Sequence, residues 1–186
     1  MLKKNLIVLL ALVLTNAVSF SQGKFYTKTG KISFFSKAPL EEIEGKNKTV
    51  TAVVDSKNGA IQFAVQMKGF EFEKQLMQQH FNENYVESDK YPKAEFKGTI
   101  SNNSAINYTK DGTYTTKVKG KLTIHGVTKD VETTGTLKIN GGKIDANSTF
   151  NVLMSDYNIK IPAVVKDKVS NNIKITVNCD LEPLKS

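Results

Sequence analysis

Arginine and tryptophan are absent from this chain, and cysteine and histidine are rare. All 26 basic residues are lysine, which gives a formal net charge of +8 without any guanidinium group. Because arginine reads guanine edges and clamps phosphates with paired hydrogen bonds, its absence weakens the hypothesis of a nucleic-acid partner. Lys117, Lys119 and Lys121 alternate with apolar residues, as on the solvated outer face of a strand. We expect a solvated basic surface and no nucleic-acid partner, with weak contact to anionic lipid headgroups as the functional alternative.

Residues that commonly carry catalysis or bind metals are too few and too scattered to form a motif. The single cysteine, Cys179, cannot form an intrachain disulfide, and its alternating apolar surroundings predict a small buried side chain. His80 and His125 lie in separate segments without zinc-ligand spacing, and His125 is interpreted as a turn residue. A nucleophile elbow, a G-x-G-x-x-G motif and a P-loop are all missing. We predict no catalytic residues, no metal site and no enzymatic activity.

The N-terminal segment has the pattern of a signal peptide. A basic start at residues 3–4 precedes an apolar run at residues 6–14, which is shorter than the ~20 residues that span a bilayer. Ser19 and Ser21 supply small residues before a predicted cleavage at Gln22, and no cysteine stands there to carry a lipid anchor. A retained anchor helix is the less favoured alternative. The predicted organisation is a signal peptide, residues 1–21, and one periplasmic or secreted domain, residues 22–186.

After Gln22 the chain shows the two-residue period of β-strands almost throughout. In residues 60–68 the apolar Ile61, Phe63, Val65 and Met67 alternate with small or polar side chains. Asn-Gly at residues 58–59 and His-Gly at residues 125–126 are hairpin signals. The expected strands cover residues 25–34, 50–55, 60–68, 94–108, 113–124, 127–139, 143–154 and 172–181. Eight antiparallel neighbours of this kind can close into a barrel that holds a small ligand.

Two segments break the alternation. Residues 70–85 carry apolar side chains at spacings of four and five, which predicts a short amphipathic helix beside one mouth of the barrel. Residues 155–170 are expected to be an irregular excursion with a 3₁₀ turn. The fold class predicted from the sequence is therefore all-β, an eight-stranded antiparallel barrel with a short helix between strands.

Two segments also resemble the signature of a known family. Residues 119–131, Lys-Gly-Lys-Leu-Thr-Ile-His-Gly-Val-Thr-Lys-Asp-Val, and residues 90–98, Lys-Tyr-Pro-Lys-Ala-Glu-Phe-Lys-Gly, are similar to YceI-like (lipid/polyisoprenoid-binding) proteins. Residues 150–159 fit the family pattern F-x-V-x-x-x-D-Y-x-I. The resemblance implies a lipocalin-like barrel whose long tunnel holds a polyisoprenoid or a related amphiphilic lipid. Many relatives carry a histidine in an H-S-x-I-x-F strand, and residues 30–35 of this chain lack it.

The alternation also predicts which side chains face inward. Burying an apolar ligand against such side chains gains ~25 cal/mol per Å². A solid core built from the same side chains is an alternative that periodicity cannot separate from a tunnel. Val131 is expected inward, and Gln62, Gln66, Lys97, Lys119 and Lys121 outward. The predicted tunnel-lining, ligand-binding residues are Phe63, Val65, Met67, Phe96, Ile100, Leu122, Phe150 and Val152.

Three functions fit this pattern. The first is a periplasmic or secreted carrier of isoprenoid lipids, with a bound isoprenoid or quinone and no other cofactor. The second is a stress-related structural or interaction protein with a filled barrel and no lipid. The third, a lipid-modifying enzyme, is disfavoured because no catalytic constellation is present. The expected partner is an amphiphilic lipid, with weak membrane-surface contact, and the oligomeric state stays open.

Overall fold

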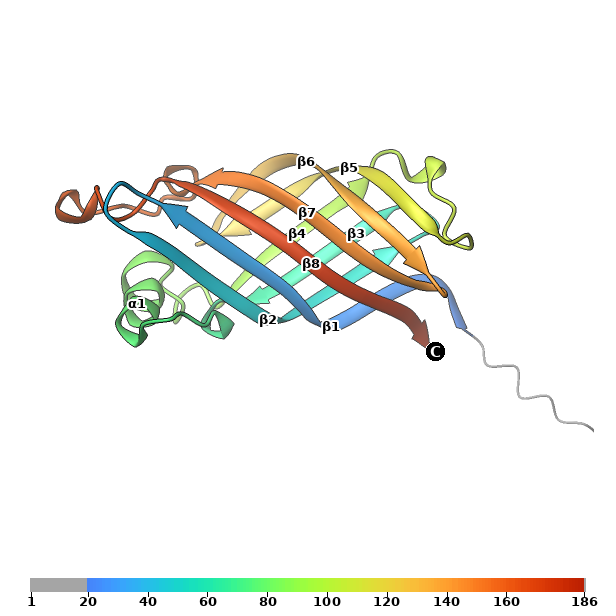
Figure 1. Ribbon diagram of the computed structural model, residues 1–186, viewed down its shortest axis with the longest axis horizontal. Helices are drawn as coiled ribbons and strands as arrows, with labels where there is room; N and C mark the ends of the chain where they lie inside the picture. Colours follow the sequence, from blue (N-terminus) through green and yellow to red (C-terminus); the bar gives the residue numbers. More distant parts are fainter. Residues whose placement is uncertain (1–19, 186) are drawn as a thin grey trace, which may run out of the picture.

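The computed structural model describes residues 20–185, and within them the chain forms a closed barrel of eight antiparallel strands. Each strand pairs with the next along the chain, and β8 returns to pair with β1, so no sheet edge is left over (Figure 1). The predicted fold class is confirmed. The strands are β1 (Phe20–Lys37), β2 (Glu42–Asp55), β3 (Ala60–Gln66), β4 (Lys93–Ile100), β5 (Gly112–Ile124), β6 (Val127–Asn140), β7 (Lys143–Leu153) and β8 (Asn172–Lys185).

The predicted signal peptide, residues 1–21, lies almost entirely outside the described residues, and its cleavage before Gln22 stays a prediction.

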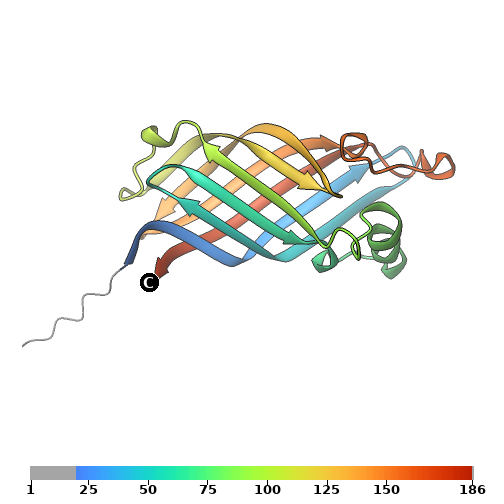
Figure 2. The same cartoon turned by 180° about the vertical axis from the view of Figure 1, so that it is seen from behind.

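The two ends of the barrel are built differently (Figure 2). At one end lie the helix α1 (Gln75–His80) and the long connection between β7 and β8, and we call this the mouth end. The opposite end, which we call the closed end, carries shorter turns and the loop between β4 and β5. The mouth end comprises residues 38–41, 67–92, 125–126 and 154–171, and the closed end comprises residues 56–59, 101–111 and 141–142.

The strand predicted over residues 94–108 is too long, because β4 ends at Ile100. Asparagine side chains replace the strand ladder beyond that point: the backbone N–H of Lys117 donates to Asn102 Oδ1 at 2.8 Å, and Asn103 Nδ2 donates to the carbonyl of Ser56 at 2.9 Å. A 3₁₀ turn, η3 (Asn103–Ala105), follows, and Ile106 then folds under the barrel as a buried residue. Local side-chain hydrogen bonds thus end the strand and plug the closed end.

The helix predicted over residues 70–85 begins later than expected. Residues 70–74 are not helical, and Glu71 instead exchanges backbone hydrogen bonds with Lys46 on β2, at 2.8 and 3.0 Å. Helix α1 starts at Gln75 and continues into a single π-helical turn, η2 (Phe81–Tyr85). The strand predicted over residues 60–68 also ends early, at Gln66, and a 3₁₀ turn, η1 (Met67–Gly69), follows it.

The excursion expected at residues 155–170 is present and contains two 3₁₀ turns, η4 (Met154–Tyr157) and η5 (Ala163–Val165). The loop at residues 58–59 and the tight turn at residues 125–126 connect neighbouring strands, as predicted. Gly126 has φ +74° and His125 has φ +50°, the positive values that a two-residue hairpin turn between right-twisted strands requires.

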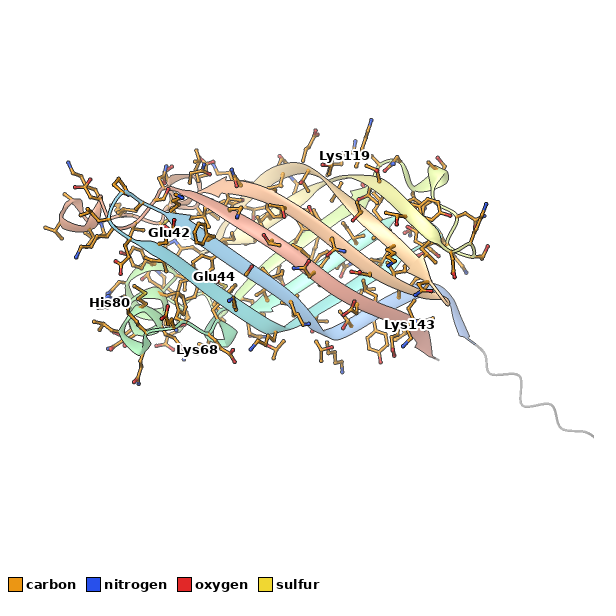
Figure 3. All side chains as sticks on the ribbon, viewed as in Figure 1. Glu42, Glu44, Lys68, His80, Lys119 and Lys143 are labelled. Atoms are coloured by element: carbon orange, nitrogen blue, oxygen red, sulfur yellow. The ribbon has the colours of Figure 1, made fainter. Side chains whose placement is uncertain are left out.

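The core is solid at the closed end. Ile144, Leu181, Ile139 and Cys179 there are 0–2% exposed, as the prediction of a buried Cys179 requires. Burial raises the pKa of the Cys179 thiol to about 11, so the side chain stays protonated and packs as a small apolar group. The charged side chains project outward, as Lys119 and Lys143 show (Figure 3).

A pair of glycines lets β4 and β5 come together under an aromatic ring. Gly98 and Gly120 face each other across the two strands, and a Cβ on Gly120 would lie 2.5 Å from the carbonyl oxygen of Lys97 and 2.7 Å from Cζ of Phe96. The first of these contacts is with the backbone, which could shift only at a substantial cost in free energy. The glycine pair therefore sets how closely the ring of Phe96 lies against the wall.

Replacing Gly120 by alanine is expected to lower the free energy of unfolding by about 1–3 kcal/mol, because the new methyl group overpacks this contact. Urea denaturation of the variant and the parent measures the difference. The neighbouring outward residue supplies the control, since Lys121→Ala should stay within about 0.5 kcal/mol of the parent. A Gly120→Ala variant as stable as the control would contradict the tight contact.

Candidate functional site

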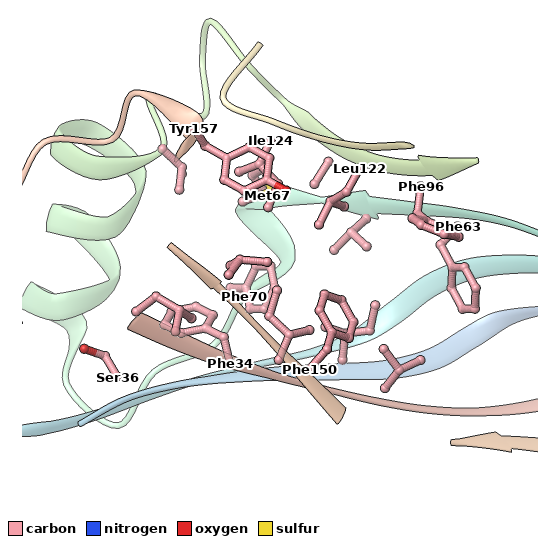
Figure 4. A pocket seen from close by; sticks show the side chains of 18 of the residues that line it. Phe34, Ser36, Phe63, Met67, Phe70, Phe96, Leu122, Ile124, Phe150 and Tyr157 are labelled. Carbon is pink, nitrogen blue, oxygen red and sulfur yellow. The ribbon is translucent and has the colours of Figure 1, made fainter. Parts of the chain in front are cut away.

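A cavity of about 560 Å³ occupies the interior of the barrel. All eight residues predicted to line a tunnel do border it, and so does Val131 (Figure 4 labels five of the eight). Gln62, Gln66, Lys97, Lys119 and Lys121 are exposed on the outside, so the predicted register is right. The role of the lining residues as ligand contacts stays a prediction. The eight are Phe63, Val65, Met67, Phe96, Ile100, Leu122, Phe150 and Val152.

Partial burial of inward side chains marks where the barrel is hollow. Phe63, Phe96, Phe150 and Val152 point inward yet are only partly buried, whereas the inward residues of the closed end are almost fully covered. Inward side chains of a solid barrel would touch one another across its axis. Here they border the open cavity instead. The barrel is therefore packed at its closed end and hollow toward its mouth.

Four phenylalanines form a cluster where the cavity approaches α1. Phe34 of β1 lies 5.3–5.7 Å, centroid to centroid, from the rings of Phe70, Phe72 and Phe81. Phe81 is also within 5.4 Å of Phe70 and Phe72. All four line the cavity, and the sequence analysis did not include them among the lining residues. Phe70 and Phe81 could have been found on the apolar face of the predicted helix, but nothing in the spacing marks Phe72.

Ionisable side chains border the cavity only toward the mouth. Glu41, Lys74, His80 and Lys168 all belong to mouth-end segments, and Lys74 Nζ lies 3.7 Å from Glu41 Oε1. A fifth ionisable neighbour, Glu95 near the start of β4, faces solvent and pairs with Lys97 at 3.9 Å. The lining beyond these groups is mostly hydrocarbon, with a few hydroxyl-bearing residues and Asn147. The cavity thus presents an ionic rim and an apolar interior.

His125 ties the mouth-end segments together. Its Nε2 lies 2.6 Å from Glu87 Oε2, and its Nδ1 lies 3.0 Å from the carbonyl oxygen of Tyr157. The ring of Tyr91 packs against it at 4.6 Å between centroids. Both of these partners are oxygen atoms that can accept a hydrogen bond from the ring. His125 is at the turn, as predicted, but its partners lie more than thirty residues away along the chain, where no local pattern indicates them.

The hydrogen bond between His125 and Glu87 predicts a specific loss of stability in acid. The hydrogen bond from His125 holds the pKa of Glu87 below its ordinary value, and the charge of Lys90 adds to this. A carboxyl whose pKa is lower in the folded chain stabilises the fold above its unfolded pKa and loses that contribution as the pH falls through the folded pKa. We expect the melting temperature of the parent to fall more steeply below about pH 4.5 than that of Glu87→Gln.

Thermal unfolding followed by circular dichroism over this pH range measures the effect. Glu132→Gln on the outer face of β6 is the matched control and should follow the parent. Parallel pH profiles for the parent and Glu87→Gln would contradict the role of the pair.

Among residues 20–185, no three His, Cys, Asp or Glu side chains are grouped so that they could hold a metal ion. No helix in the same residues combines the length and the apolar character needed to cross a membrane.

Burial raises the pKa of the Tyr157 phenol to about 12, so this lining side chain is a neutral hydroxyl at physiological pH. The arrangement is suited to enclosing an apolar chain.

Comparison with known proteins gives one family and several solved structures. The model of the YceI-like domain family matches residues 15–181, and none of the curated proteins matches the chain. A polyisoprenoid binding domain from Saccharophagus degradans, implicated in plant cell wall breakdown, superposes with a TM-score of 0.76 at 12% identity, over 87% of this chain and 98% of that one.

Two further solved structures share the barrel. BcnA from Burkholderia cenocepacia has a TM-score of 0.68 at 21% identity, over 82% of this chain and 95% of its own. The YCEI protein from Campylobacter jejuni has a TM-score of 0.55 at 19% identity, over 73% and 82% respectively. At these identities the likeness is one of fold.

Proposed function

Because the chain belongs to the YceI-like domain family, whose model matches residues 15–181, we propose that its cavity binds a polyisoprenoid or a similar amphiphilic lipid. The observation that carries the proposal is the hollow, apolar half of the barrel, about 560 Å³ in volume. Cavities that bind small molecules are usually 300–1,000 Å³ and mostly apolar. The solved polyisoprenoid binding domain with the same fold supports the choice of ligand class.

The affinity for such a ligand comes from buried area. An isoprenoid chain offers no hydrogen bonds, so it gains only by leaving water for a surface of Phe, Ile, Val, Leu and Met side chains. The partly buried Phe63, Phe96 and Phe150 still have apolar surface to offer, which favours a ligand over the alternative of a filled, lipid-free barrel.

We propose binding rather than catalysis. Among the described lining residues, no serine or threonine hydroxyl is hydrogen-bonded to a histidine or a carboxylate, which is the pairing that activates a nucleophile. An isoprenoid quinone is one ligand that the cavity suits, since its carbonyls are neutral and its tail is hydrocarbon.

Displacement of a fluorescent isoprenoid analogue from the purified protein tests the proposal. Saturable binding of one analogue per chain, reversed by long-chain isoprenoids, is the expected result. An absence of binding across several long-chain isoprenoids would favour the filled-barrel alternative.

We also propose that the protein works in the periplasm or outside the cell. The support is the N-terminal sequence, with its basic start, its apolar run at residues 6–14 and the small residues Ser19 and Ser21. The mature chain is expected to begin at Gln22. N-terminal sequencing of the exported protein tests this, and exported material that still begins at Met1 would contradict it.

A further inference from the structure

Three hydroxyl side chains on neighbouring strands line the interior part of the cavity. Thr116 on β5, Thr133 on β6 and Ser148 on β7 all line it, and Gly135 of β6 pairs with both Thr116 and Ser148. A Cβ on Gly135 would lie 3.1 Å from Thr116 Oγ1 and 3.3 Å from Ser148 Cβ. It would also lie 2.6 Å from the backbone oxygen of Asn147, so only glycine fits where these strands approach one another. We call Thr116, Thr133 and Ser148 the hydroxyl site.

The hydroxyl site keeps hydrogen-bonding capacity for a ligand. Ser148 Oγ and Thr133 Oγ1 both donate to the carbonyl of Thr134, at 2.8 and 3.2 Å, so their oxygens remain free to accept. Thr116 is only 2% exposed, and its hydroxyl makes no hydrogen bond to any of the described residues. A ligand oxygen in the cavity beside Thr116 would give this hydroxyl an acceptor or a donor.

The position of the hydroxyl site and the absence of charged side chains among the described residues around it define which ligand oxygen fits there. Thr116 lies in the closed-end half of β5, whereas the charged lining residues Glu41, Lys74 and Lys168 all lie at the mouth end. A phosphate buried at the hydroxyl site would have no cation to offset its desolvation. An alcohol is neutral and can both accept from Thr116 and donate to Thr133 or Ser148, and a carbonyl is neutral and can accept from Thr116.

We infer that the hydroxyl site binds the neutral polar end of the lipid, an alcohol or a ketone, and that the hydrocarbon tail runs toward the mouth. The inference rests on the proposed function and narrows its ligand class. It excludes prenyl diphosphates as the preferred ligand, because their charged end would have to enter first.

Three ligands with one chain length separate the possibilities: geranylgeraniol, the hydrocarbon of the same skeleton, and geranylgeranyl diphosphate. The parent is expected to bind the alcohol more tightly than the other two. Thr116→Val, which keeps the shape and removes the hydroxyl, should weaken alcohol binding about two- to tenfold and leave hydrocarbon binding unchanged. Thr116→Ser should keep the preference for the alcohol, and the outward Thr115→Val is the matched control.

Two results would contradict this orientation of the ligand. The first is that the parent binds the diphosphate most tightly, and the second is that Thr116→Val binds the alcohol as tightly as the parent does. A loss of alcohol binding in Tyr157→Phe but not in Thr116→Val would place the polar end near the mouth. If the parent binds neither the alcohol nor the hydrocarbon, the proposed function fails as well, whereas equal binding of the two refutes the hydroxyl site alone.

A separate observation concerns the outside of the mouth. Within residues 20–185 the exposed large hydrophobic residues are Leu40, Leu76, Leu153 and Val164, at 71%, 61%, 41% and 90% exposure. All four lie at the mouth end, on the β1–β2 connection, on α1, at the end of β7 and on η5 (Figure 1). Such residues otherwise appear neither on the barrel sides nor at the closed end of the described chain.

The most exposed of these residues form separate projecting tips around the opening. The backbone N–H of Leu40 donates to the carbonyl of Asp167 at 2.9 Å, which holds the first tip, residues 38–41, beside the second, residues 162–165. Lys37 and Lys166 flank the two tips, together with the acidic Glu42 and Asp167, and Lys37 Nζ lies 3.1 Å from Glu42 Oε1. Leu76, on α1, is both exposed and part of the cavity lining, so the apolar surface continues from the outside into the cavity.

We propose that these tips insert into the surface of a lipid bilayer, so that the cavity opens onto its apolar phase. Apolar tips flanked by lysines suit the interface, where the apolar groups enter the acyl region and the ammonium groups reach the headgroups. Protein interfaces instead need broad complementary surfaces, and isolated projecting tips do not supply one. A bilayer would also be the source of an isoprenoid ligand.

Flotation with vesicles of phosphatidylcholine, with and without phosphatidylglycerol, tests this proposal. The mature parent, beginning at Gln22, is expected to float with the vesicles, and Leu40→Ser/Val164→Ser in the same mature chain to lose at least half of that bound fraction. Asn140→Ser at the closed end is the control and should float like the parent. Equal flotation of parent and double variant would overturn the proposal, as would a parent that stays unbound. A dimer that the double variant dissociates, without flotation of the parent, would assign the tips to self-association instead.

Discussion

Replacing Phe150 by asparagine is expected to weaken binding of an isoprenoid by roughly 5- to 150-fold, which corresponds to about 1–3 kcal/mol. Phe150 points into the cavity and is only partly buried there, so a bound lipid would cover its ring. An amide in its place would lose water when the lipid binds and gain no partner. Displacement of the fluorescent isoprenoid analogue from the variant and the parent gives the ratio of affinities.

The same substitution on the outer face supplies the control for Phe150→Asn. Phe35 lies on β1 between two inward residues, and its ring faces outward, 5.2 Å from the ammonium group of Lys174. Phe35→Asn should leave the affinity unchanged, and circular dichroism must show that both variants fold. Equal affinities of folded Phe150→Asn and the parent would contradict a ligand in the cavity.

Filling the cavity from the inside is the second large expected effect. Val131 lines the cavity and is only partly buried, so Val131→Phe has space for its ring. We expect the folded stability to change little and the isoprenoid affinity to fall at least about tenfold, because the ring occupies volume that the ligand needs.

The same Val-to-Phe substitution in a packed part of the barrel should instead lower the folding stability. Val50 on β2 is fully buried and does not line the cavity, so Val50→Phe should lower the free energy of unfolding by about 1–3 kcal/mol through overpacking. Urea denaturation compares the two variants. If Val131→Phe were destabilised as much as Val50→Phe, the interior at Val131 would be filled rather than open.

The direction of each wall side chain could be predicted from the sequence, but the space between the walls could not. Alternation fixes that Phe63 faces inward and Gln62 outward, since a one-residue slip would exchange the two faces. It does not say how far Phe63 is from the opposite wall, because that distance depends on strand number, tilt and the plug at the closed end. Only the three-dimensional structure therefore distinguishes a tunnel from a solid core.

Contacts between distant segments account for most of what the sequence analysis missed. The pairing of Glu71 with Lys46 delays the helix, and the bonds of Asn102 and Asn103 stop β4 at Ile100. Hydrogen bonds of this kind, made by asparagine side chains and by the backbone, cannot be predicted from the alternation of apolar residues in a strand. The contact between His125 and Glu87 is of the same kind, since the two residues meet only after the barrel has closed.

Native mass spectrometry of the protein purified from its own host tests the central claim, that the barrel is a container for lipid, most directly. The account predicts a complex of one chain with one lipid, whose released mass and fragmentation are those of an isoprenoid with a neutral polar end. The bare mass of the chain, unchanged after incubation with a range of long-chain isoprenoid alcohols and quinones, would contradict it.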